Sequence, residues 1–329
     1  MAELDVRGND PNREPSVIIQ QMAVDIYAGL SVKAEIRVQH VQTKREIEAT
    51  LAAMGLSPRK RFGQHFLIDG NLMRRLIDCA ELEPDDVVLE AGGGTGGLTD
   101  LLVGRVGHAV CVEIDRQFFA LLEDRFAGRG DITLVPGDVL ESKHTVRKEV
   151  IDAVAARCGR GQAAKLVSNL PYSIATPLLM NLLVDHPMFR TLCFTVQAEV
   201  AERLTAAPGC REYGPLSVVV QTLAAAETIA HVPPSAFWPR PAVASSLIRM
   251  EVREAPPIAA NEAHAFAGFV RGVFDHRRKT LRSALRYVAD AEACTRVFAG
   301  VDASRRPESF SPKEWLDVFR MINEPDGRR

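Results

Sequence analysis

The sequence predicts an α/β protein in which a mainly parallel, doubly wound sheet is followed by a small all-helical domain. Short apolar runs of strand length alternate with segments whose apolar residues recur every three or four positions. The apolar run at residues 87–89 leads into five glycines within the six positions 92–97, and a run of helical character follows. Glycine permits a tight turn and a close approach to a ligand, so this stretch predicts a buried strand, a turn and a helix. After residues 256–257 the composition becomes helical.

The remaining elements follow from the same periodicities. Strands are predicted at residues 109–112, 132–135, 165–168, 191–196, 218–223 and 246–250. Helices are predicted at residues 71–82, 115–126, 143–158, 261–273, 280–288 and 312–322, and another begins at Thr176 and Pro177. Asp115 is the expected N-cap of its helix, and proline is tolerated in a first helical turn.

Polar side chains lie at the ends of the successive parallel strands. Glu90 precedes the glycines, Glu113 ends the second strand, Asp138 follows the third and Asn169 follows the fourth. Side chains in these places build the ligand site of an open α/β sheet. The spacing of Gly92, Gly94 and Gly97 fits a dinucleotide fingerprint, but Glu113 suits ribose hydroxyls and Asp138 an adenine amine, with no partner for a pyrophosphate. Carboxylates also favour a cationic sulfonium, so the pattern favours S-adenosylmethionine over NAD.

Residues 169–172, Asn-Leu-Pro-Tyr, indicate the chemistry. An adenine-like amine is a poor nucleophile because its lone pair is delocalised, so it needs acceptors that draw its N–H bonds out of the ring plane. The Asn169 side-chain oxygen and a carbonyl of the turn at Pro171 supply two acceptors. The Tyr172 ring offers a face for a base taken out of its stack. The alternative is an ordinary strand-to-helix turn, in which asparagine and proline are common.

Several separate motifs occur in the order expected of one enzyme family. Beside the motifs above, the chain carries Arg-Phe-Gly-Gln-His-Phe-Leu at residues 61–67 and Phe-Trp-Pro-Arg-Pro-Ala-Val-Ala-Ser at residues 237–245. Together they resemble the ribosomal RNA adenine N6,N6-dimethyltransferase family over residues 44–286. The resemblance implies a Rossmann-like methyltransferase that acts in ribosome assembly. It would use S-adenosylmethionine to dimethylate two adjacent adenosines near the 3′ end of small-subunit rRNA.

The resemblance also assigns residues to the site. It places cofactor contacts at His65, Leu67, Gly92, Gly94, Glu113, Asp138 and Asn169, and the catalytic turn at Asn169, Pro171 and Tyr172. The family often carries asparagine where this chain has His65. Phe237 is expected to face the flipped adenine opposite Tyr172, and a buried aromatic that anchors its loop is the alternative.

Three other functions remain open. One is a small-molecule methyltransferase, which would have no reason to carry a basic helical appendage. A relative that acts on large-subunit rRNA, of the macrolide-resistance type, shares the fold and the Asn-(Leu/Ile)-Pro-Tyr turn, although the segments at residues 237–241 and 277–282 favour the small-subunit type. A non-catalytic ribosome-assembly factor would keep the fold without the chemistry. The intact Glu113, Asp138 and residues 169–172 argue against that alternative.

The composition excludes several classes of protein. The apolar fraction of 47% and the charged fraction of 25% are ordinary for a soluble globular protein, and no apolar run is long enough to span a membrane. The six cysteines are scattered without metal-ligand spacing, which is typical of a reduced compartment. We therefore expect a cytoplasmic monomer that binds neither a membrane nor a metal ion.

A formal net charge of −2 requires any RNA surface to be local. Between residues 265 and 286 a basic segment sets six cations against Asp275: Arg271, Arg277, Arg278, Lys279, Arg282 and Arg286. If a helix runs from near residue 277 through residue 288, then Arg278, Arg282 and Arg286 share a face, and we expect Arg278 and Arg282 to bind RNA phosphates. The alternatives are a solvated helix face, or an RNA surface at residues 59–61.

The sequence predicts a division of the chain into three parts. They are an extension at 1–43, expected to be disordered, a methyltransferase domain at 44–254 and a helical RNA-binding domain at 255–329.

Overall fold

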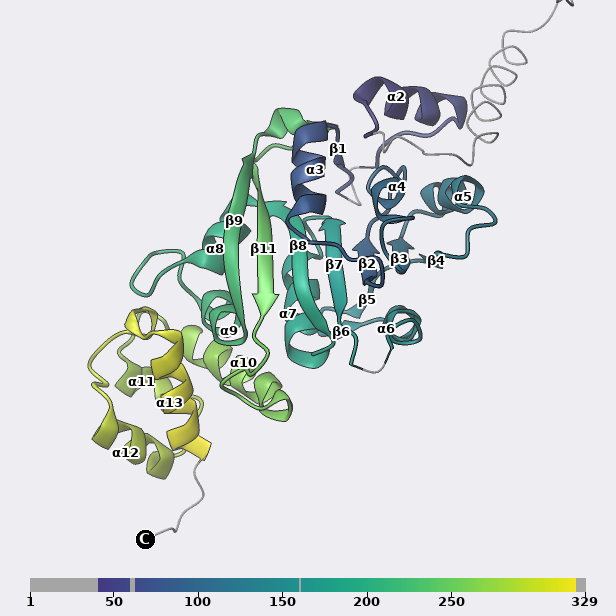
Figure 1. Cartoon of the computed structure of the whole chain (residues 1–329). Coiled ribbons are helices and arrows are strands. Elements are labelled where there is room, and N and C mark those ends of the chain that lie inside the picture. Colours follow the sequence, from purple (N-terminus) through teal and green to yellow (C-terminus); the bar gives the residue numbers. More distant parts are fainter. Residues whose placement is uncertain (1–40, 60–62, 160, 324–329) are drawn as a thin grey trace, which may run out of the picture.

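A seven-stranded sheet organises the protein. The computed structural model describes residues 41–59, 63–159 and 161–323 (Figure 1). In this part of the chain the main sheet has the order β4-β3-β2-β7-β8-β11-β9. Its strands are β2 (Val87–Ala91), β3 (His108–Glu113), β4 (Ile132–Pro136), β7 (Ala164–Asn169), β8 (Phe189–Gln197), β9 (Ala224–Val232) and β11 (Ser245–Val252). The first five strands in that order pair in parallel, and β11 is antiparallel to both β8 and β9. The predicted α/β fold with a mainly parallel, doubly wound sheet is confirmed.

Helices cover both faces of this sheet. They are α3 (Gly70–Asp78), α4 (Thr99–Leu102), α5 (Arg116–Arg125), α6 (Lys148–Ala155), α7 (Ala175–Asp185), α8 (Ala198–Thr205) and α9 (Pro215–Leu223). Val88 and Cys111 point to the face covered by α3, α4 and α5, whereas Val87 and Leu89 point to the face covered by α6, α7 and α9. Burial on both faces explains why these strands are nearly continuous apolar runs. Asp115 caps α5 as predicted, because its carboxylate accepts a hydrogen bond from the Gln117 amide at 3.0 Å.

Two short strands join distant parts of the chain beside the sheet. β1 (Phe66–Leu67) pairs antiparallel with β10 (Phe237–Trp238), and Leu67 lies opposite Phe237. This pairing brings the motif at residues 61–67 next to the motif at residues 237–245. Before β1, helix α2 (Lys44–Ala53) begins with a capping box between Thr43 and Glu46. Of the predicted extension at residues 1–43, all but the last three residues lie outside the described part of the chain.

The prediction of a strand at residues 218–223 is wrong, because these residues belong to helix α9. Gly214 precedes the helix and Pro215 occupies its first position, where a proline loses no helical hydrogen bond. The helix is buried almost all round, so its valines produce an apolar run without the periodicity of a surface helix. The strand of this region begins one residue after the helix, at Ala224.

Two other predicted helices are shorter than expected. The helix predicted at residues 143–158 begins only at Lys148, because β5 (Leu140–Ser142) and β6 (Thr145–Val146) form a hairpin before it. The helix predicted at residues 280–288 is α11 (Leu281–Leu285), and its N-cap Thr280 has an extended backbone with ψ of 156°. No helix runs from near residue 277 into α11. The prediction that Arg278, Arg282 and Arg286 share one helical face is therefore wrong.

The helices after β11 pack against the sheet domain through a common core. They are α10 (Ala260–Phe274), α11, α12 (Ala291–Gly300) and α13 (Pro312–Asn323), with a short 3-10 helix at Pro307–Ser309. Trp315 is fully buried, and its ring lies 5.5–6.1 Å from those of Phe269, Phe274 and Phe310. The same apolar core contains Leu89 of β2. A domain division after residue 254 stays a prediction, since this core extends across it.

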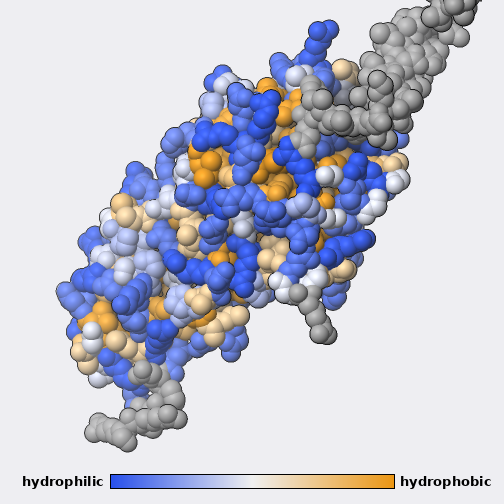
Figure 2. Space-filling model, in the orientation of Figure 1, coloured by the Kyte–Doolittle hydropathy of each residue, from blue (hydrophilic) through white to orange (hydrophobic). Residues whose placement is uncertain are grey.

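One face of the protein carries mainly polar residues (Figure 2). Figure 2 shows hydrophilic residues over most of one face, with hydrophobic residues in patches between them. Among the helices that the structure describes, none combines the length and the apolar character needed to cross a bilayer.

Truncation of a shared core residue tests whether the sheet and the C-terminal helices unfold together. Phe266 of α10 is fully buried against Phe319, so Phe266→Ala should lower the free energy of unfolding by about 3–5 kcal/mol. Because one core joins the two parts, tryptophan fluorescence and far-ultraviolet circular dichroism should report a single urea transition. Met54→Ala, at a side chain that is 42% exposed, serves as control with a change of about 0.5 kcal/mol or less. Two separate transitions, with only one shifted, would show that the parts fold independently.

Candidate active site

The glycine-rich turn after β2 forms one wall of a cavity. Gly92 and Gly94 have φ angles of +91° and +54°, which favour glycine. A Cβ on Gly94 would lie 2.9 Å from the Phe66 ring, and one on Gly92 would lie 3.2 Å from the Pro171 ring. The turn therefore packs closely against two motifs that are distant in sequence. The cavity has about 790 Å³ of empty space when the part open to solvent is included.

Glu113 joins the end of β3 to this turn. One carboxylate oxygen accepts a hydrogen bond from the Gly94 amide at 2.8 Å, and the other accepts one from the Asp115 amide at 2.8 Å. Glu113 is 4% exposed, and burial raises the pKa of its carboxyl above the ordinary value. Each oxygen keeps a second lone pair for a ligand hydroxyl.

Glu90 is a second acid in the cavity wall and is 1% exposed. The Thr99 hydroxyl donates to its carboxyl oxygen at 2.6 Å. Burial raises the pKa of Glu90 to about 8, so the side chain is mainly protonated at neutral pH in the ligand-free protein. A cation bound nearby would favour the ionised form and lower that pKa.

The turn at residues 169–172 closes the cavity opposite the glycines. The Asn169 amide nitrogen donates to the His65 carbonyl at 2.7 Å, while its oxygen accepts a hydrogen bond from the buried Thr195 hydroxyl. These two contacts fix the orientation of the amide. The Tyr172 hydroxyl lies 2.6 Å from the Ser245 hydroxyl, so the position of the ring is also fixed.

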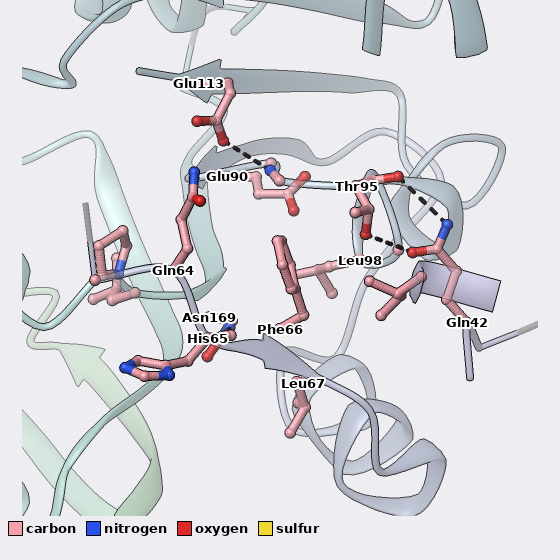
Figure 3. Close-up of a pocket in the computed structure, with 18 of the residues that line it drawn as sticks. Gln42, Gln64, His65, Phe66, Leu67, Glu90, Thr95, Leu98, Glu113 and Asn169 are labelled. Atoms are coloured by element: carbon pink, nitrogen blue, oxygen red, sulfur yellow. Dashed lines mark hydrogen bonds between the residues drawn. The ribbon is translucent and has the colours of Figure 1, made fainter. Parts of the chain in front are cut away.

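His65 connects the turn at residues 169–172 with the loop after β10. Its Nδ1 atom lies 2.7 Å from the Pro239 carbonyl, and its ring lies 5.6 Å from the Tyr172 ring at 30°. A carbonyl only accepts, so Nδ1 carries the hydrogen of this bond. Figure 3 shows His65 beside Asn169, with Glu113 and Glu90 on the other side of the cavity.

The structure brings most of the predicted site residues together, but not all. His65, Leu67, Gly92, Gly94, Glu113, Asn169, Pro171 and Tyr172 line the cavity. Phe237 is 3% exposed and packs in the core rather than in the lining, which matches the alternative of a buried anchor. Asp138 also lies outside the lining, and its carboxylate accepts a hydrogen bond from the Leu140 amide at 3.0 Å. The roles predicted for both residues stay predictions.

Two amide side chains of the lining were not assigned from the sequence. Gln42 hydrogen-bonds the Thr95 hydroxyl at 2.6 Å and so covers the glycine-rich turn (Figure 3). Gln64 accepts a hydrogen bond from the Arg59 amide at 2.7 Å, but its buried Nε2 has no partner among the described residues. Nothing in the sequence signalled Gln42, which falls in the predicted extension, whereas Gln64 lies inside the motif at residues 61–67.

A family model described as Ribosomal RNA adenine dimethylase matches residues 55–324. The chain belongs to the ribosomal RNA adenine dimethylase family. Relatives named Ribosomal RNA small subunit methyltransferase A agree with this assignment. The one from Moorella thermoacetica is 38% identical over 285 residues, which cover 86% of this chain and 98% of the relative. The one from Pelotomaculum thermopropionicum is 38% identical over 280 residues, covering 83% and 94%.

Solved structures confirm the fold of this adenine dimethylase. A dimethyladenosine transferase from Plasmodium falciparum has a TM-score of 0.64 at 21% identity, and covers 79% of this chain and 98% of its own. The 23S rRNA methyltransferase ErmE has a TM-score of 0.58 at 24% identity, covering 79% and 100%. The chain is thus an rRNA adenine dimethyltransferase with the sheet of its class.

The basic residues predicted to bind RNA lie away from the cavity of this dimethylase. Arg278 and Arg282 are exposed on the C-terminal helices, and the Arg282 guanidinium lies 4.3 Å from the centre of the Phe298 ring. At the alternative surface, Arg59 pairs with the buried Asp115 at 3.4 Å, so this cation is engaged within the protein. Lys60 and Arg61 lie outside the described residues.

Replacement of Glu90 tests its protonation state. Its pKa is raised in the folded protein, so its contribution to stability is complete below the unfolded pKa and is lost as pH rises through about 8. Glu90→Gln removes this titration. The free energy of unfolding of the variant minus that of wild type should therefore rise by about 1–3 kcal/mol from pH 6 to pH 9. Urea denaturation without ligand measures it. A constant difference across this range would show that Glu90 is ionised throughout.

Proposed function

We propose that the chain transfers two methyl groups from S-adenosylmethionine to N6 of each of two adjacent adenosines near the 3′ end of small-subunit rRNA. The observation that carries this proposal is the presence of residues 169–172 and the glycine-rich turn in the lining of one cavity. The curated relatives bear a small-subunit name at 34–38% identity. The large-subunit alternative rests on likeness to ErmE at 24% identity, which supports the fold alone.

The cavity fits the cofactor by the chemistry of its lining. Glu90 and Glu113 offer carboxylates to a sulfonium and to ribose hydroxyls, and the unpartnered Gln64 amide offers a donor. Gly92 and Gly94 give the turn its path along the cavity wall, and His65, Leu67, Asp138 and Asn169 complete the proposed set. When bound, S-adenosylmethionine supplies an electrophilic methyl group.

The residues of the turn act on the target amine. Thr195 and His65 hold the Asn169 amide so that the remaining lone pair of its oxygen is available to an N6 hydrogen. A carbonyl of the turn at Pro171 supplies a second acceptor. Together they draw the N–H bonds out of the ring plane and make the lone pair available for attack. Tyr172, held by Ser245, offers its ring face to the flipped base.

Substrate binding is assigned to a surface outside the cavity. Arg278 and Arg282 bind RNA phosphates in this proposal, and Phe237 supports the loop beside Tyr172. The protein acts as a monomer in the cytoplasm, without a metal ion.

In a strain that lacks the gene, the two adenosines should be unmethylated, and restoring the gene should restore both dimethyl groups. Methylation of large-subunit rRNA instead would overturn the small-subunit assignment.

Asn169→Ala should reduce the rate of methyl transfer far more than RNA affinity. The amide oxygen contributes most in the transition state, so the rate should fall on the order of 10²–10³-fold, with the dissociation constant for unmethylated small subunits nearly unchanged. Tyr172→Phe is the matched control, since it keeps the ring and should keep most activity, whereas Tyr172→Ala should not. If Tyr172→Phe is as damaging as Tyr172→Ala, the hydroxyl and not the ring face is the essential group.

Charge reversal at Arg278 and Arg282 tests the RNA surface. Arg278→Glu combined with Arg282→Glu should weaken binding to small ribosomal subunits and flatten its dependence on salt, because phosphate contacts are lost. Binding of S-adenosylmethionine, measured by calorimetry, should stay intact. Equal subunit affinity across a salt titration would place the RNA surface elsewhere.

A further inference from the structure

An exposed pair of stacked rings lies on the C-terminal helices. Tyr287, just after α11, is 58% exposed and is the most exposed large hydrophobic side chain in the described part of the chain. Its ring stacks on that of His276, which follows α10, with centroids 3.8 Å apart and an interplanar angle of 27°. The buried Phe274 and Phe310 pack around Trp315 instead. The Tyr287 ring therefore contributes little to the core.

Neighbouring side chains hold this exposed ring in place. The Lys279 ammonium lies 4.4 Å from the centre of the Tyr287 ring and also donates a hydrogen bond to its hydroxyl. His276 supports one face of the ring. His276 and Lys279 thus hold an aromatic side chain that is 58% exposed. A ring fixed before binding loses little conformational entropy when a ligand stacks on it.

The chain segment that carries the rings is strongly basic, although the exposed Asp275 directly precedes it. From residue 276 to residue 287 the chain carries five cations and no acid: Arg277, Arg278, Lys279, Arg282 and Arg286. Arg278, Arg282 and Arg286 are exposed. Cations attract a phosphate backbone, and an aromatic ring among them provides a face for an unpaired base. A protein partner that recognised an apolar ring would not require this density of positive charge.

We infer that Tyr287, supported by His276, is a stacking platform for an unpaired nucleotide of the RNA substrate. The identity of that RNA rests on the proposed function. In Figure 1 the helices α11 to α13 lie at the opposite end of the molecule from α2, which contributes Ile47 to the catalytic cavity. Tyr287 is therefore a docking residue, and the nucleotide that it binds is not the adenosine that is methylated.

Binding of unmethylated small ribosomal subunits to Tyr287 variants tests the platform. Tyr287→Ala should raise the dissociation constant about 5- to 150-fold, which is the usual worth of one stacked base. Tyr287→Phe and Tyr287→Trp should bind as wild type, because they keep a ring. The slope of affinity against salt should not change in Tyr287→Ala, whereas Arg278→Ala should reduce it by about one, because only the arginine contacts a phosphate. Equal affinity of Tyr287→Ala and wild type would overturn the inference.

Crosslinking identifies what the ring contacts. A photoreactive benzophenone amino acid at position 287 should crosslink to a single-stranded nucleotide of small-subunit rRNA, and a crosslink to a ribosomal protein would overturn the inference. Methylation of the same subunits by the wild-type protein is measured in parallel. If wild type methylates them but Tyr287→Ala binds normally, the platform alone is wrong. If wild type methylates none, the proposed function is wrong.

Discussion

The hydrogen bond from the Gly94 amide to the buried Glu113 carboxylate is the contact on which the cavity depends. It ties the turn after β2 to the end of β3 at 2.8 Å. With the turn held there, Gly94 lies against Phe66 and Gly92 against Pro171, at distances that leave no room for a side chain. The segments near residues 66, 93, 113 and 171 therefore pack together around the cavity. The same carboxylate that would bind a cofactor hydroxyl thus also shapes the wall of its site.

Much of the fold could be predicted because the parallel strands are buried on both faces and give continuous apolar runs. The same property caused the error at residues 218–223, since a helix buried on all sides also lacks a polar stripe. The error at residues 280–288 has another cause. Apolar positions suggested one helix, but the extended backbone at Thr280 breaks it, and no proline or glycine stands there to signal the break.

The residues of the candidate site could be predicted where they shape a turn of the backbone or stand at the end of a strand. The glycines, the acids Glu90 and Glu113 and the Asn-Leu-Pro-Tyr turn carry their signal locally, and the cavity gathers them. Asp138, the remaining strand-end acid, lies outside the lining. Gln42 and Gln64 carry no such signal, because an amide side chain is equally common on a solvated surface. Their place in the wall depends on how distant segments of the chain meet, as Gln42 meets Thr95 of the glycine-rich turn, and only the tertiary structure determines this. Phe237 pairs with Leu67 and its ring packs in the core, so the role predicted for it stays a prediction.

The sheet and the C-terminal helices share one core, which fixes the distance between the cavity and the far helices. Close-packed interiors transmit strain rather than bend, so the span from the cavity to the far helices is set by the fold. An RNA can present its target base and a docking segment at this same distance. Once one of them is bound, the other binds at a high effective concentration, whereas a fragment that carries only one of them has no such advantage. With RNA docked on the far helices as proposed, such a protein would measure the shape of its substrate. It would distinguish an RNA already folded into a particle from the same nucleotides in a loose strand, and so report on the stage of assembly.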